Sequence, residues 1–357
     1  MQTRVLMAMS GGIDSSVSAL LLLEQGYELV GVTFRTFDSI KESCLAREKG
    51  CCSVESIMEA KHLAEQLGFE HHILDYRQIF RDTVIRNFVD EYMHGRTPNP
   101  CVLCNSHIKW GELVRAADEY GCDYIATGHY ARIAEHRGHL YLKNAVDNRK
   151  DQTYFLWMLT EQNLRRTLFP LGSLTKPEVR EIAAQHGYEK LSKKTESQEI
   201  CFVPNNDYRS FLTEQGCKVE AGNYINKVGE VLGTHEGFCN YTIGQRKGLG
   251  IALGEPRFVT RINALTNEVT LGGHDDLLTT AISASSVRIR DIDWLRDDPA
   301  VEVRIRYRSQ PVSAGLTGIT PDTLTLVTDT PVWGVTPGQS LVLYKDGLLV
   351  GGGIINV

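Results

Sequence analysis

The sequence predicts an α/β protein with a Rossmann-like parallel sheet in its N-terminal domain, followed by a small linking domain and a C-terminal β-barrel. Strand-like apolar runs alternate with amphipathic helices over the first 130 residues, as in a sheet covered by helices. Beyond about residue 204, short β-branched runs alternate with Gly, Asn and Asp. The length of 357 residues suits two or three domains. We place them at 1–204, 205–272 and 273–357.

The N-terminal elements follow from apolar periodicity and from the residues that end each run. Gly26 and Gly68 end two of the helices, and Ser53 is a candidate cap for the second. Thr175 and Pro177 mark the start of a later helix. In order, we expect strands at 5–8, 29–34, 73–76 and 124–127, and helices at 14–25, 57–67, 78–93, 106–121 and 177–186.

Two proline- and glycine-containing segments predict local geometry. Pro98 and Pro100 predict an irregular chain over 95–101, so that the next helix is capped by Asn105 or Ser106. In the C-terminal part, Asp346-Gly347 lies between two apolar runs and predicts a two-residue hairpin turn.

Composition and charge narrow the class of protein. Hydrophobic residues make up 42% and charged residues 23% of the chain, close to the average of soluble globular proteins. The longest apolar run near the N-terminus, residues 19–23, is far shorter than the roughly 18 residues that span a bilayer. We therefore expect no membrane contact and a cytoplasmic location. A net charge of −6 argues against a non-specific DNA-coating protein but is compatible with a local RNA-binding face.

A serine- and glycine-rich segment, Ser10-Gly-Gly-Ile-Asp-Ser-Ser16, lies between the first strand and the first helix. Its glycines allow a tight turn that presents backbone N–H groups to an anion, and the helix N-terminus adds the positive end of its dipole. The serine hydroxyls are further donors, and Asp14 is a candidate ligand for Mg²⁺. An ordinary glycine-rich βα turn is the alternative. The segment lacks the Gly-Lys-Ser/Thr of a Walker motif, which argues against kinase or GTPase chemistry.

The pattern Ser-Gly-Gly-x-Asp-Ser resembles the loop of the PP-loop ATP pyrophosphatases. This resemblance implies that the loop holds the β- and γ-phosphates of ATP while a substrate oxygen attacks the α-phosphate. Pyrophosphate then leaves, and a second nucleophile displaces AMP.

Two cysteine clusters suggest what that second nucleophile is. The nine cysteines, an odd number, form no disulfide framework. Cys104, in Cys101-Val-Leu-Cys104, is expected just before a helix N-terminus, where the helix dipole favours the thiolate. Together with Cys201 it suggests sulfur transfer. The alternative is a zinc site in which Cys51 and Cys52 complete the ligand set.

Further sequence blocks make a resemblance specific. They are Arg96-Thr-Pro-Asn-Pro, Cys104-Asn, Tyr124-Ile-Ala-Thr-Gly-His-Tyr, Lys150-Asp-Gln-Thr-Tyr-Phe-Leu, Gln198-Glu-Ile-Cys-Phe, Thr242-Ile-Gly-Gln-Arg-Lys-Gly-Leu-Gly, Arg306-Tyr-Arg, Thr336-Pro-Gly-Gln and Gly351-Gly-Gly-Ile. With these blocks in this order, the chain resembles the bacterial tRNA-specific 2-thiouridylases, the MnmA family, over essentially its whole length.

The resemblance implies a three-domain enzyme that uses ATP and Mg²⁺ to convert the wobble uridine of certain tRNAs to 2-thiouridine. Cys201 would receive a persulfide sulfur from a donor protein, and Cys104 would complete the transfer with formation of a Cys104–Cys201 disulfide. The implied ATP contacts are Ala8, Met9, Ser10, Gly11, Gly12, Ile13, Asp14, Ser15, Phe34 and Gly128. The implied tRNA contacts are Asn99, Pro100 and Cys101 at the target base, and His129, Lys150, Asp151, Gln152, Arg306, Tyr307 and Gln339 elsewhere.

One position departs from the family pattern. Many relatives have Asp where this chain has Cys101, at a position that the resemblance places beside the target base. With Cys104 and Cys201, this cysteine could supply three ligands of a [4Fe–4S] cluster and leave one iron open for hydrosulfide. We favour the persulfide relay and keep the cluster as the alternative.

An arginine row is a further candidate for RNA contact. Arg304, Arg306 and Arg308 alternate, so on a strand all three would share one face, which suits phosphates and a stacked base at Tyr307. A solvated barrel face is the alternative. Lys150-Asp151-Gln152 before an apolar run could likewise be a plain helix cap.

Two rival functions differ in what the cysteines do. An amidating PP-loop synthetase would use ammonia or an amine and would not need Cys104 or Cys201. A zinc-stabilised RNA-binding protein would carry no catalysis at all.

Overall fold

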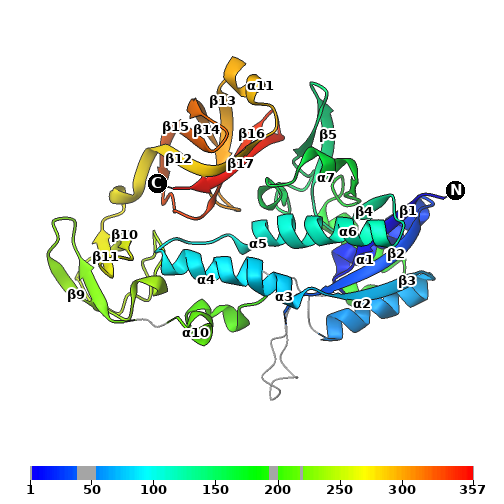
Figure 1. Cartoon of the computed structure of the whole chain (residues 1–357), viewed down its shortest axis with the longest axis horizontal. Coiled ribbons are helices and arrows are strands. Elements are labelled where there is room, and N and C mark those ends of the chain that lie inside the picture. The colour runs from blue at the N-terminus through cyan, green and yellow to red at the C-terminus, as the bar shows by residue number, and fades with distance from the viewer. Residues whose placement is uncertain (1, 38–53, 193–199, 218–219, 357) are drawn as a thin grey trace. The chain divides into compact units, whose positions relative to one another are not determined.

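The computed structural model describes residues 2–37, 54–192, 200–217 and 220–356 (Figure 1). The chain divides into two compact units. Unit 1 comprises Met1–Val84, Cys101–Asn206 and Gly347–Leu349, and unit 2 comprises Ile85–Pro100, Asp207–Asp346 and Val350–Val357. The domain boundaries at 204 and 272 stay a prediction.

Unit 1 is built on a parallel five-stranded sheet in the order β3-β2-β1-β4-β7. The predicted strands are confirmed, and β3 begins three residues earlier than expected. Strand order reverses at β1, and in open α/β sheets the carboxyl edge at such a reversal is where ligands bind. The strands are β1 (Arg4–Ala8), β2 (Glu28–Arg35), β3 (Glu70–Asp75), β4 (Tyr124–Ala126) and β7 (Thr167–Leu168).

Helices cover both faces of this sheet. Helices α1 (Ile13–Glu24) and α2 (Val54–Leu67) enclose a core that contains Met7 of β1, Leu22 of α1 and Leu63 of α2. Figure 1 shows the strands lying between α2 and α6 (Leu113–Glu119). The candidate cap Ser53 lies outside the described residues.

Helix α8 (Lys176–Gln185) confirms the predicted helix at 177–186. Its start is fixed by Glu178, whose carboxylate accepts hydrogen bonds from the backbone N–H (2.6 Å) and the hydroxyl (2.7 Å) of Thr175. Val179 and Ala183 pack with Ile13 and Val17 of α1 in a second apolar cluster. The N-termini of α1 and α8 are thereby held in one unit.

The prediction for the segment around residue 100 is wrong in one respect. The helix expected at 78–93 is present as α3 (Arg77–Phe80), η2 (Arg81–Ile85) and α4 (Arg86–Met93). The next helix, however, begins at Pro100 rather than at 105 or 106, as α5 (Pro100–Leu103), and continues through η3 (Cys104–Glu112) into α6. The first helical position tolerates proline because its N–H would have no intrahelical partner there.

Unit 2 contains the predicted small β domain and barrel. The small sheet has the order β10-β11-β8-β9, and its core includes Tyr224, Val259 and Val269. In the barrel, β12 pairs with both β15 and β17 and so closes six strands. The strands are β8 (Gly222–Ile225), β9 (Val231–His235), β10 (Phe258–Asn263), β11 (Glu268–Gly272), β12 (Leu278–Ile289), β13 (Ala300–Arg304), β14 (Val312–Ile319), β15 (Thr323–Trp333), β16 (Ser340–Lys345) and β17 (Leu348–Ile355).

The Asp346-Gly347 hairpin between β16 and β17 is confirmed. Both residues have positive φ, 52° and 73°, as a type I′ turn requires. The antiparallel hairpin of unit 1, formed by β5 (Arg132–His136) and β6 (His139–Lys143), is not among the predicted elements. The remaining elements are the helices α7 (Glu161–Arg165), α9 (Glu189–Ser192), α10 (Tyr208–Glu214) and α11 (Ile292–Asp297) and short 3₁₀ turns at 153–155, 204–206, 238–240 and 275–277. Over the described ranges, no helix has the length and apolar character needed to cross a membrane.

Candidate active site

The predicted phosphate loop lies between β1 and α1, at the carboxyl edge of the sheet where strand order reverses. Gly11 has φ of +66°, and a Cβ there would lie 2.2 Å from the carbonyl oxygen of Ser56, so only glycine fits. Gly12 occupies the N-cap of α1 and provides no side-chain acceptor. The first N–H groups of α1 are therefore not capped by a side chain at that position, the arrangement that binds phosphate at helix N-termini.

The loop serines hold the shape of the loop. The hydroxyls of Ser15 and Ser16 each donate to the carbonyl oxygen of Gly12 at 3.0 Å, and the backbone N–H of Ser10 donates to Ser15 Oγ at 3.1 Å. Ser15 and Ser16 are both buried. The hydroxyl hydrogens of Ser15 and Ser16 are directed within the loop, and Ser10 Oγ lies 3.3 Å from Ser15 Oγ. The predicted contacts of these serines with ATP stay predictions.

Gly128, predicted to contact ATP, lies against the loop. It follows β4, and a Cβ there would lie 2.9 Å from the backbone nitrogen of Ser15 and 2.9 Å from the carbonyl carbon of Asp14. Phe34, near the carboxyl end of β2, packs edge-on against Tyr76 with ring centroids 5.0 Å apart. Its contact with ATP stays a prediction.

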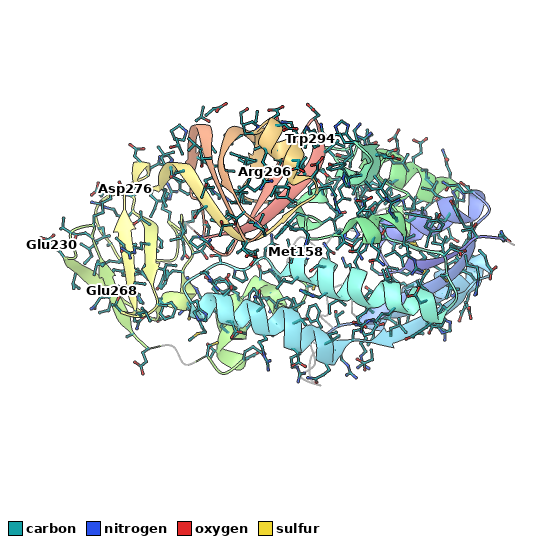
Figure 2. The ribbon with its side chains drawn as sticks, turned by 45° about the horizontal axis from the view of Figure 1, so that its top comes forward. Met158, Glu230, Glu268, Asp276, Trp294 and Arg296 are labelled. Atoms are coloured by element: carbon teal, nitrogen blue, oxygen red, sulfur yellow. The ribbon has the colours of Figure 1, made fainter. Side chains whose placement is uncertain are left out.

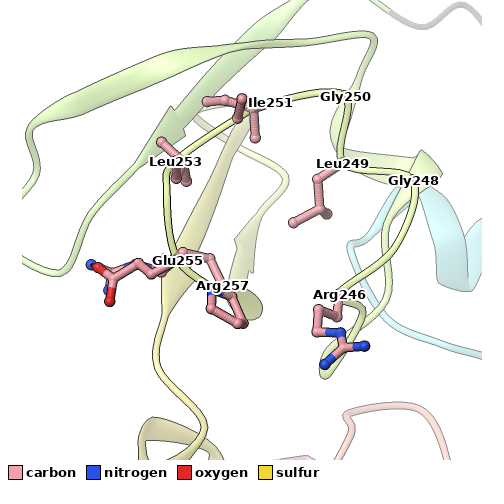
Figure 3. A pocket seen from close by; sticks show the side chains of 10 residues that line it. Arg246, Gly248, Leu249, Gly250, Ile251, Leu253, Glu255 and Arg257 are labelled. Atoms are coloured by element: carbon pink, nitrogen blue, oxygen red, sulfur yellow. Dashed lines mark hydrogen bonds and ion pairs between the residues drawn. The ribbon is translucent and has the colours of Figure 1, made fainter.

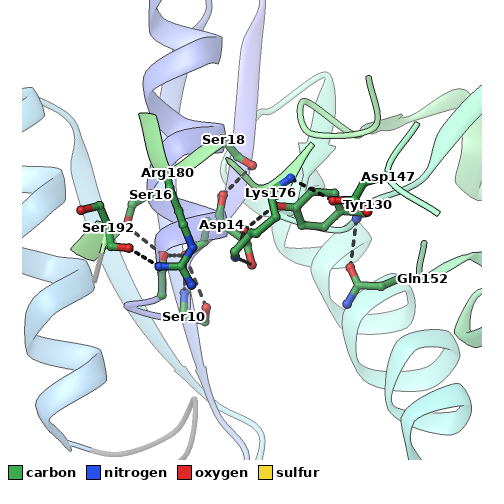
Figure 4. Close-up of polar contacts among 12 residues, drawn as sticks. Ser10, Asp14, Ser16, Ser18, Tyr130, Asp147, Gln152, Lys176, Arg180 and Ser192 are labelled. Atoms are coloured by element: carbon green, nitrogen blue, oxygen red, sulfur yellow. Dashed lines mark hydrogen bonds and ion pairs between the residues drawn. The ribbon is translucent and has the colours of Figure 1, made fainter. Parts of the chain in front are cut away.

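Asp14, the candidate Mg²⁺ ligand, is the centre of a polar cluster (Figure 4). Its two carboxylate oxygens accept hydrogen bonds from the Lys176 ammonium at 2.7 and 2.9 Å. The hydroxyl of Tyr130 donates to Oδ1 at 2.8 Å. Mg²⁺ commonly binds through one or two carboxylates together with substrate phosphates and water, so this single carboxylate fits such an ion.

Sequence reasoning missed Lys176. It lies 162 residues from Asp14 in the chain, and its side chain is 8% exposed. Its position at the start of a predicted helix could have pointed to a role, because a positive charge there opposes the helix dipole. A lysine at such a position suggests a partner outside the helix.

His129 is a buried, neutral histidine. Burial, with the Lys109 ammonium adding to it, holds the pKa of His129 well below the usual range. Lys109 Nζ lies 3.4 Å from Nε2, and Thr127 Oγ1 lies 2.8 Å from Nδ1. Because lysine can only donate, Nε2 is the acceptor and Nδ1 carries the proton. A direct tRNA contact by this residue stays a prediction.

Residues 150–152 connect to the phosphate loop. Asp151 is buried, and its Oδ1 accepts hydrogen bonds from the backbone N–H (3.1 Å) and the hydroxyl (2.9 Å) of Thr153. These are contacts between residues two apart in the chain; the N-cap of the 3₁₀ turn at 153–155 is Gln152, which makes no side-chain cap hydrogen bond. Gln152 Oε1 accepts from the backbone N–H of Tyr130 at 2.9 Å, and Tyr130 in turn reaches Asp14.

Cys104 lies inside a helix, not just before one. It is the fifth residue of the helix that starts at Pro100, so it stands beyond the first turn, where the helix dipole acts most strongly. Cys101, three residues earlier, lies on the same helical face. Cys101 is an exposed residue, but burial of its thiol raises the pKa of Cys101, while the Lys109 ammonium acts in the opposite direction.

Cys201 is exposed on a turn, with the backbone N–H of Val203 donating to the carbonyl of Ile200 at 3.0 Å. The next residue, Phe202, is buried and packs against Phe80 of α3, with ring centroids 5.5 Å apart. Helix α3 also packs against η3, the segment that begins at Cys104. Helix α3 thus contacts Phe202, the neighbour of Cys201, and also the segment η3, whose first residue is Cys104.

The predicted iron–sulfur ligands do not form a ligand cluster. In the described part of the chain, no group of three or more His, Cys, Asp or Glu side chains is placed to hold a metal ion. The three predicted iron ligands lie within that part of the chain but are not grouped there as metal ligands: Cys101, Cys104 and Cys201. Cys51 and Cys52, the cysteines of the zinc alternative, lie outside the described residues.

In unit 2, Gln339 holds the chain just before the predicted base-contact residues Asn99 and Pro100. Its Nε2 donates to the carbonyl oxygens of Thr97 (3.0 Å) and Pro98 (2.9 Å). The backbone N–H of Thr97 donates to the carbonyl of Pro337 at 2.8 Å. The predicted tRNA contact of Gln339 is untested, and its amide group already positions this loop.

The arginine row is not a strand face, so that prediction is wrong. Strand β13 ends at Arg304, and a turn follows in which the backbone N–H of Ser309 donates to the carbonyl of Arg306 at 3.1 Å. The three guanidiniums lie over different rings, at 5.2 to 5.9 Å from their centroids: Tyr344, Trp333 and Tyr307. Arg306 is exposed and also donates to the carbonyl of Trp333 at 2.7 Å.

Unit 2 also has a pocket of about 650 Å³, formed by the loop from Arg246 to Arg257 (Figure 3). Three glycines of this loop, Gly248, Gly250 and Gly254, have positive φ and let it curl around the cavity. None of the predicted site residues lines it.

Family models match almost the whole chain. They are described as the tRNA methyl transferase HUP domain (residues 3–205), the tRNA methyl transferase PRC-barrel domain (209–273) and the aminomethyltransferase beta-barrel domain (284–355). The tRNA-specific 2-thiouridylase MnmA of Amoebophilus asiaticus is 47% identical over 99% of this chain and 95% of its own length. The chain belongs to the tRNA-specific 2-thiouridylase family.

A second curated relative agrees with this family membership, whereas two solved structures are only weakly similar. The 2-thiouridylase MnmA of Clostridium perfringens is 45% identical over 99% of this chain and 98% of its own length. Among solved structures, a 4-thiouridine synthetase–RNA complex with bound ATP is 18% identical, with a TM-score of 0.38 over 60% of this chain and 50% of that one. The NMN synthetase of Francisella tularensis is 16% identical, with a TM-score of 0.37 over 61% and 79%.

The substitution Gly128→Ala tests the contact between Gly128 and the phosphate loop of this 2-thiouridylase. The added methyl group would overlap the backbone at residues 14 and 15, so we expect a loss of about 1–3 kcal/mol in unfolding free energy and weaker binding of ATP. Gly315→Ala is the control, because a Cβ at Gly315 meets nothing within 4 Å. Denaturant unfolding and calorimetric titration with ATP measure the two effects. Equal behaviour of the two variants would show that Gly128 does not support the loop.

Proposed function

We propose that this protein is an ATP-dependent tRNA-uridine 2-sulfurtransferase, which converts the wobble uridine of tRNA to 2-thiouridine. Full-length identity of 45–47% to enzymes named tRNA-specific 2-thiouridylase is the observation that carries the proposal. A phosphate loop and two cysteines in unit 1 support it. Because the substrate is tRNA, we place the enzyme in the cytoplasm.

The first step is adenylation of the base. The phosphates of ATP would bind at the N–H groups of α1 that no N-cap side chain covers, and Asp14 would hold a Mg²⁺ ion, whose charge would offset that of the phosphates. The C2 oxygen of the uridine attacks the α-phosphate, a new P–O bond forms, and pyrophosphate leaves. The oxygen is now part of an AMP leaving group.

The second step replaces that oxygen with sulfur. A donor protein loads Cys201 with a persulfide, and the exposed turn at Ile200–Val203 suits delivery by a partner. The Cys104 thiolate attacks the Cys201 sulfur, forms a disulfide and releases hydrosulfide. Hydrosulfide adds at C2 and AMP departs. A two-electron reductant, such as a second thiol pair, then reduces the Cys104–Cys201 disulfide.

We prefer the relay to an iron–sulfur cluster because Cys101, Cys104 and Cys201 are not gathered into a ligand set in the described residues. For Cys101 we propose a place beside the target base with Asn99 and Pro100. Its position one helical turn before Cys104 supports this.

We further propose that segment 150–152, His129, Arg306, Tyr307 and Gln339 serve tRNA binding. Arg306 is the best supported, since its exposed guanidinium is fixed on Trp333 by a hydrogen bond and a ring contact. Such a preorganised cation suits a phosphate. For Gln339 the support is indirect, through the loop that it holds.

Serine substitutions of the cysteines test the chemistry. We expect Cys104→Ser and Cys201→Ser each to abolish 2-thiouridine formation while tRNA binding is retained, because the thiols act only in sulfur transfer. Cys122→Ser, at a buried cysteine of the same unit, is the control and should retain activity. The assay combines ATP, a sulfur source and unmodified tRNA, with nucleoside mass spectrometry as the readout. Thiolation by the Cys104→Ser, Cys201→Ser double variant would refute the proposal.

Iron analysis separates the relay from the cluster. Protein purified without oxygen should contain no stoichiometric iron and show no visible absorbance, because the three cysteines are not placed as ligands. About four irons per chain, lost in the Cys101→Ser variant, would replace the relay with the cluster.

Arg306→Gln tests the proposed tRNA face. Loss of one phosphate contact should weaken tRNA binding several-fold and lower the slope of log affinity against log salt by about one. The control is Arg296→Gln on α11 (Figure 2), an exposed arginine of unit 2 that pairs with Asp293. Filter binding over a salt series measures both. Identical slopes for Arg306→Gln and the unmodified protein would remove Arg306 from the tRNA interface.

A further inference from the structure

We propose that Lys176 is a phosphate-binding residue, whose ammonium exchanges the Asp14 carboxylate for phosphoryl oxygens of ATP and of the pyrophosphate product. The phosphate loop has no lysine of its own, unlike a Walker motif. Helix α8 would supply one from another part of unit 1. This inference rests on the proposed function, since it assigns a residue to the same ATP site.

The position of Lys176 is unfavourable for helix α8 itself. It is the first residue of that helix, where a positive charge opposes the dipole. Its side chain is only 8% exposed, so the ammonium also loses most of its hydration. Neither cost is recovered within α8, whose start is already fixed by Thr175 and Glu178. The side chain must therefore serve a group outside its own helix.

That group lies at the phosphate loop. Lys176 Nζ lies 2.7 and 2.9 Å from the two oxygens of Asp14, the second residue of α1. A ligand whose phosphates occupied the N-terminus of α1 would therefore lie within reach of the ammonium. Figure 4 also shows Arg180, one turn further along α8, whose guanidinium donates to the carbonyl oxygen of Ser192.

The N-terminus of α1 is the end that can take an anion. At the start of α8, the carboxylates of Glu178 and Asp147 already accept hydrogen bonds from the backbone N–H groups of Thr175 and Lys176. At the start of α1 the N-cap is Gly12, which provides no side-chain acceptor, and the Lys176 ammonium lies beside Asp14 in its first turn. A triphosphate or pyrophosphate carries several negative charges and complements that helix end together with the ammonium. Asp14 is 31% exposed and so can turn to a bound cation when the ammonium leaves it.

A second buried lysine shows what a purely structural pair looks like. Lys345 of β16 has a side chain that is 9% exposed and lies 2.7 Å from an Asp298 carboxylate oxygen. Its ammonium also donates to two backbone carbonyl oxygens, those of Asp298 (2.9 Å) and Ala300 (2.8 Å), which cannot leave. Lys345 is therefore held by the main chain, whereas the Lys176 ammonium donates to a side-chain carboxylate and lies over the Tyr130 ring, 5.8 Å from the ring centroid.

Titration with ATP and with inorganic pyrophosphate tests the proposal. We expect Lys176→Met to bind both at least tenfold more weakly, and Lys176→Arg to recover part of the affinity because its charge is kept. Lys345→Met is the matched control, since it removes an equally buried lysine paired with an aspartate in unit 2. It should retain the affinity even if its melting temperature falls. Lys176→Met with reduced stability but unchanged affinity for both ligands would overturn the proposal.

A second variant remains informative if Lys176→Met does not fold. In Asp14→Asn, the amide oxygen can still accept the Tyr130 hydrogen bond, but the competing charge is gone. Without divalent metal, we expect this variant to bind pyrophosphate several-fold more tightly than the unmodified protein, because Lys176 no longer has to be released from a carboxylate. If Lys176 only tied two helices together, the affinity would be unchanged or lower, and the proposal would fail.

Failure of this proposal differs from failure of the proposed function. If the unmodified protein binds neither ATP nor pyrophosphate, the adenylation scheme is wrong, and the role of Lys176 falls with it. If the unmodified protein binds both and forms 2-thiouridine while Lys176→Met binds equally well, only the role of Lys176 is refuted.

Discussion

The ion pair between Lys176 and Asp14 sets the geometry on which the rest of the candidate site depends. Each residue stands in the first turn of its helix, so the pair brings the starts of α8 and α1 together at the carboxyl edge of the sheet. Ion pairs removed from water contribute little net stability, because lost hydration offsets the attraction. The contribution of this pair is therefore to position groups. It keeps the Lys176 ammonium beside the N-terminus of α1, where the helix itself provides only the partial charge of its dipole.

From Asp14 a chain of hydrogen bonds continues to the segment that resembles a tRNA contact. Tyr130 donates its hydroxyl to Asp14, its backbone N–H donates to Gln152, and the neighbouring Asp151 accepts from the backbone N–H of Thr153. Tyr130 and Asp151 are both buried, so water competes little for these bonds. The phosphate loop and residues 150–152 thus share one frame, which would keep the adenylating phosphate and a bound tRNA in register.

The sequence predicted the features that depend on neighbouring residues and failed where distant residues decide. The βα alternation, the Gly11-Gly12 loop and the Asp346-Gly347 turn are local, and all are present. The strand expected through Arg308 stops at Arg304 because Ser309 closes a turn that alternation alone does not reveal. The pairing of Lys176 with Asp14 could not be predicted from the sequence, because the two residues are 162 positions apart and only the fold brings them together. The helix that starts at Pro100 differs from the prediction for a local reason, because proline breaks a helix in its interior but fits its first position.

The two thiols differ in the way that a relay requires. A thiol that accepts sulfur from another protein must be reachable, and Cys201 is exposed on a short turn. A thiol that acts beside an activated base must be sheltered from other reactants, and Cys104 is half-buried within a helix. The aromatic anchor Phe202 fixes the Cys201 turn to Phe80 of α3, and α3 packs on the segment that starts at Cys104. One short helix of unit 1 thus connects the turn of the exposed Cys201 to the segment that starts at the half-buried Cys104, an arrangement that suits the proposed relay.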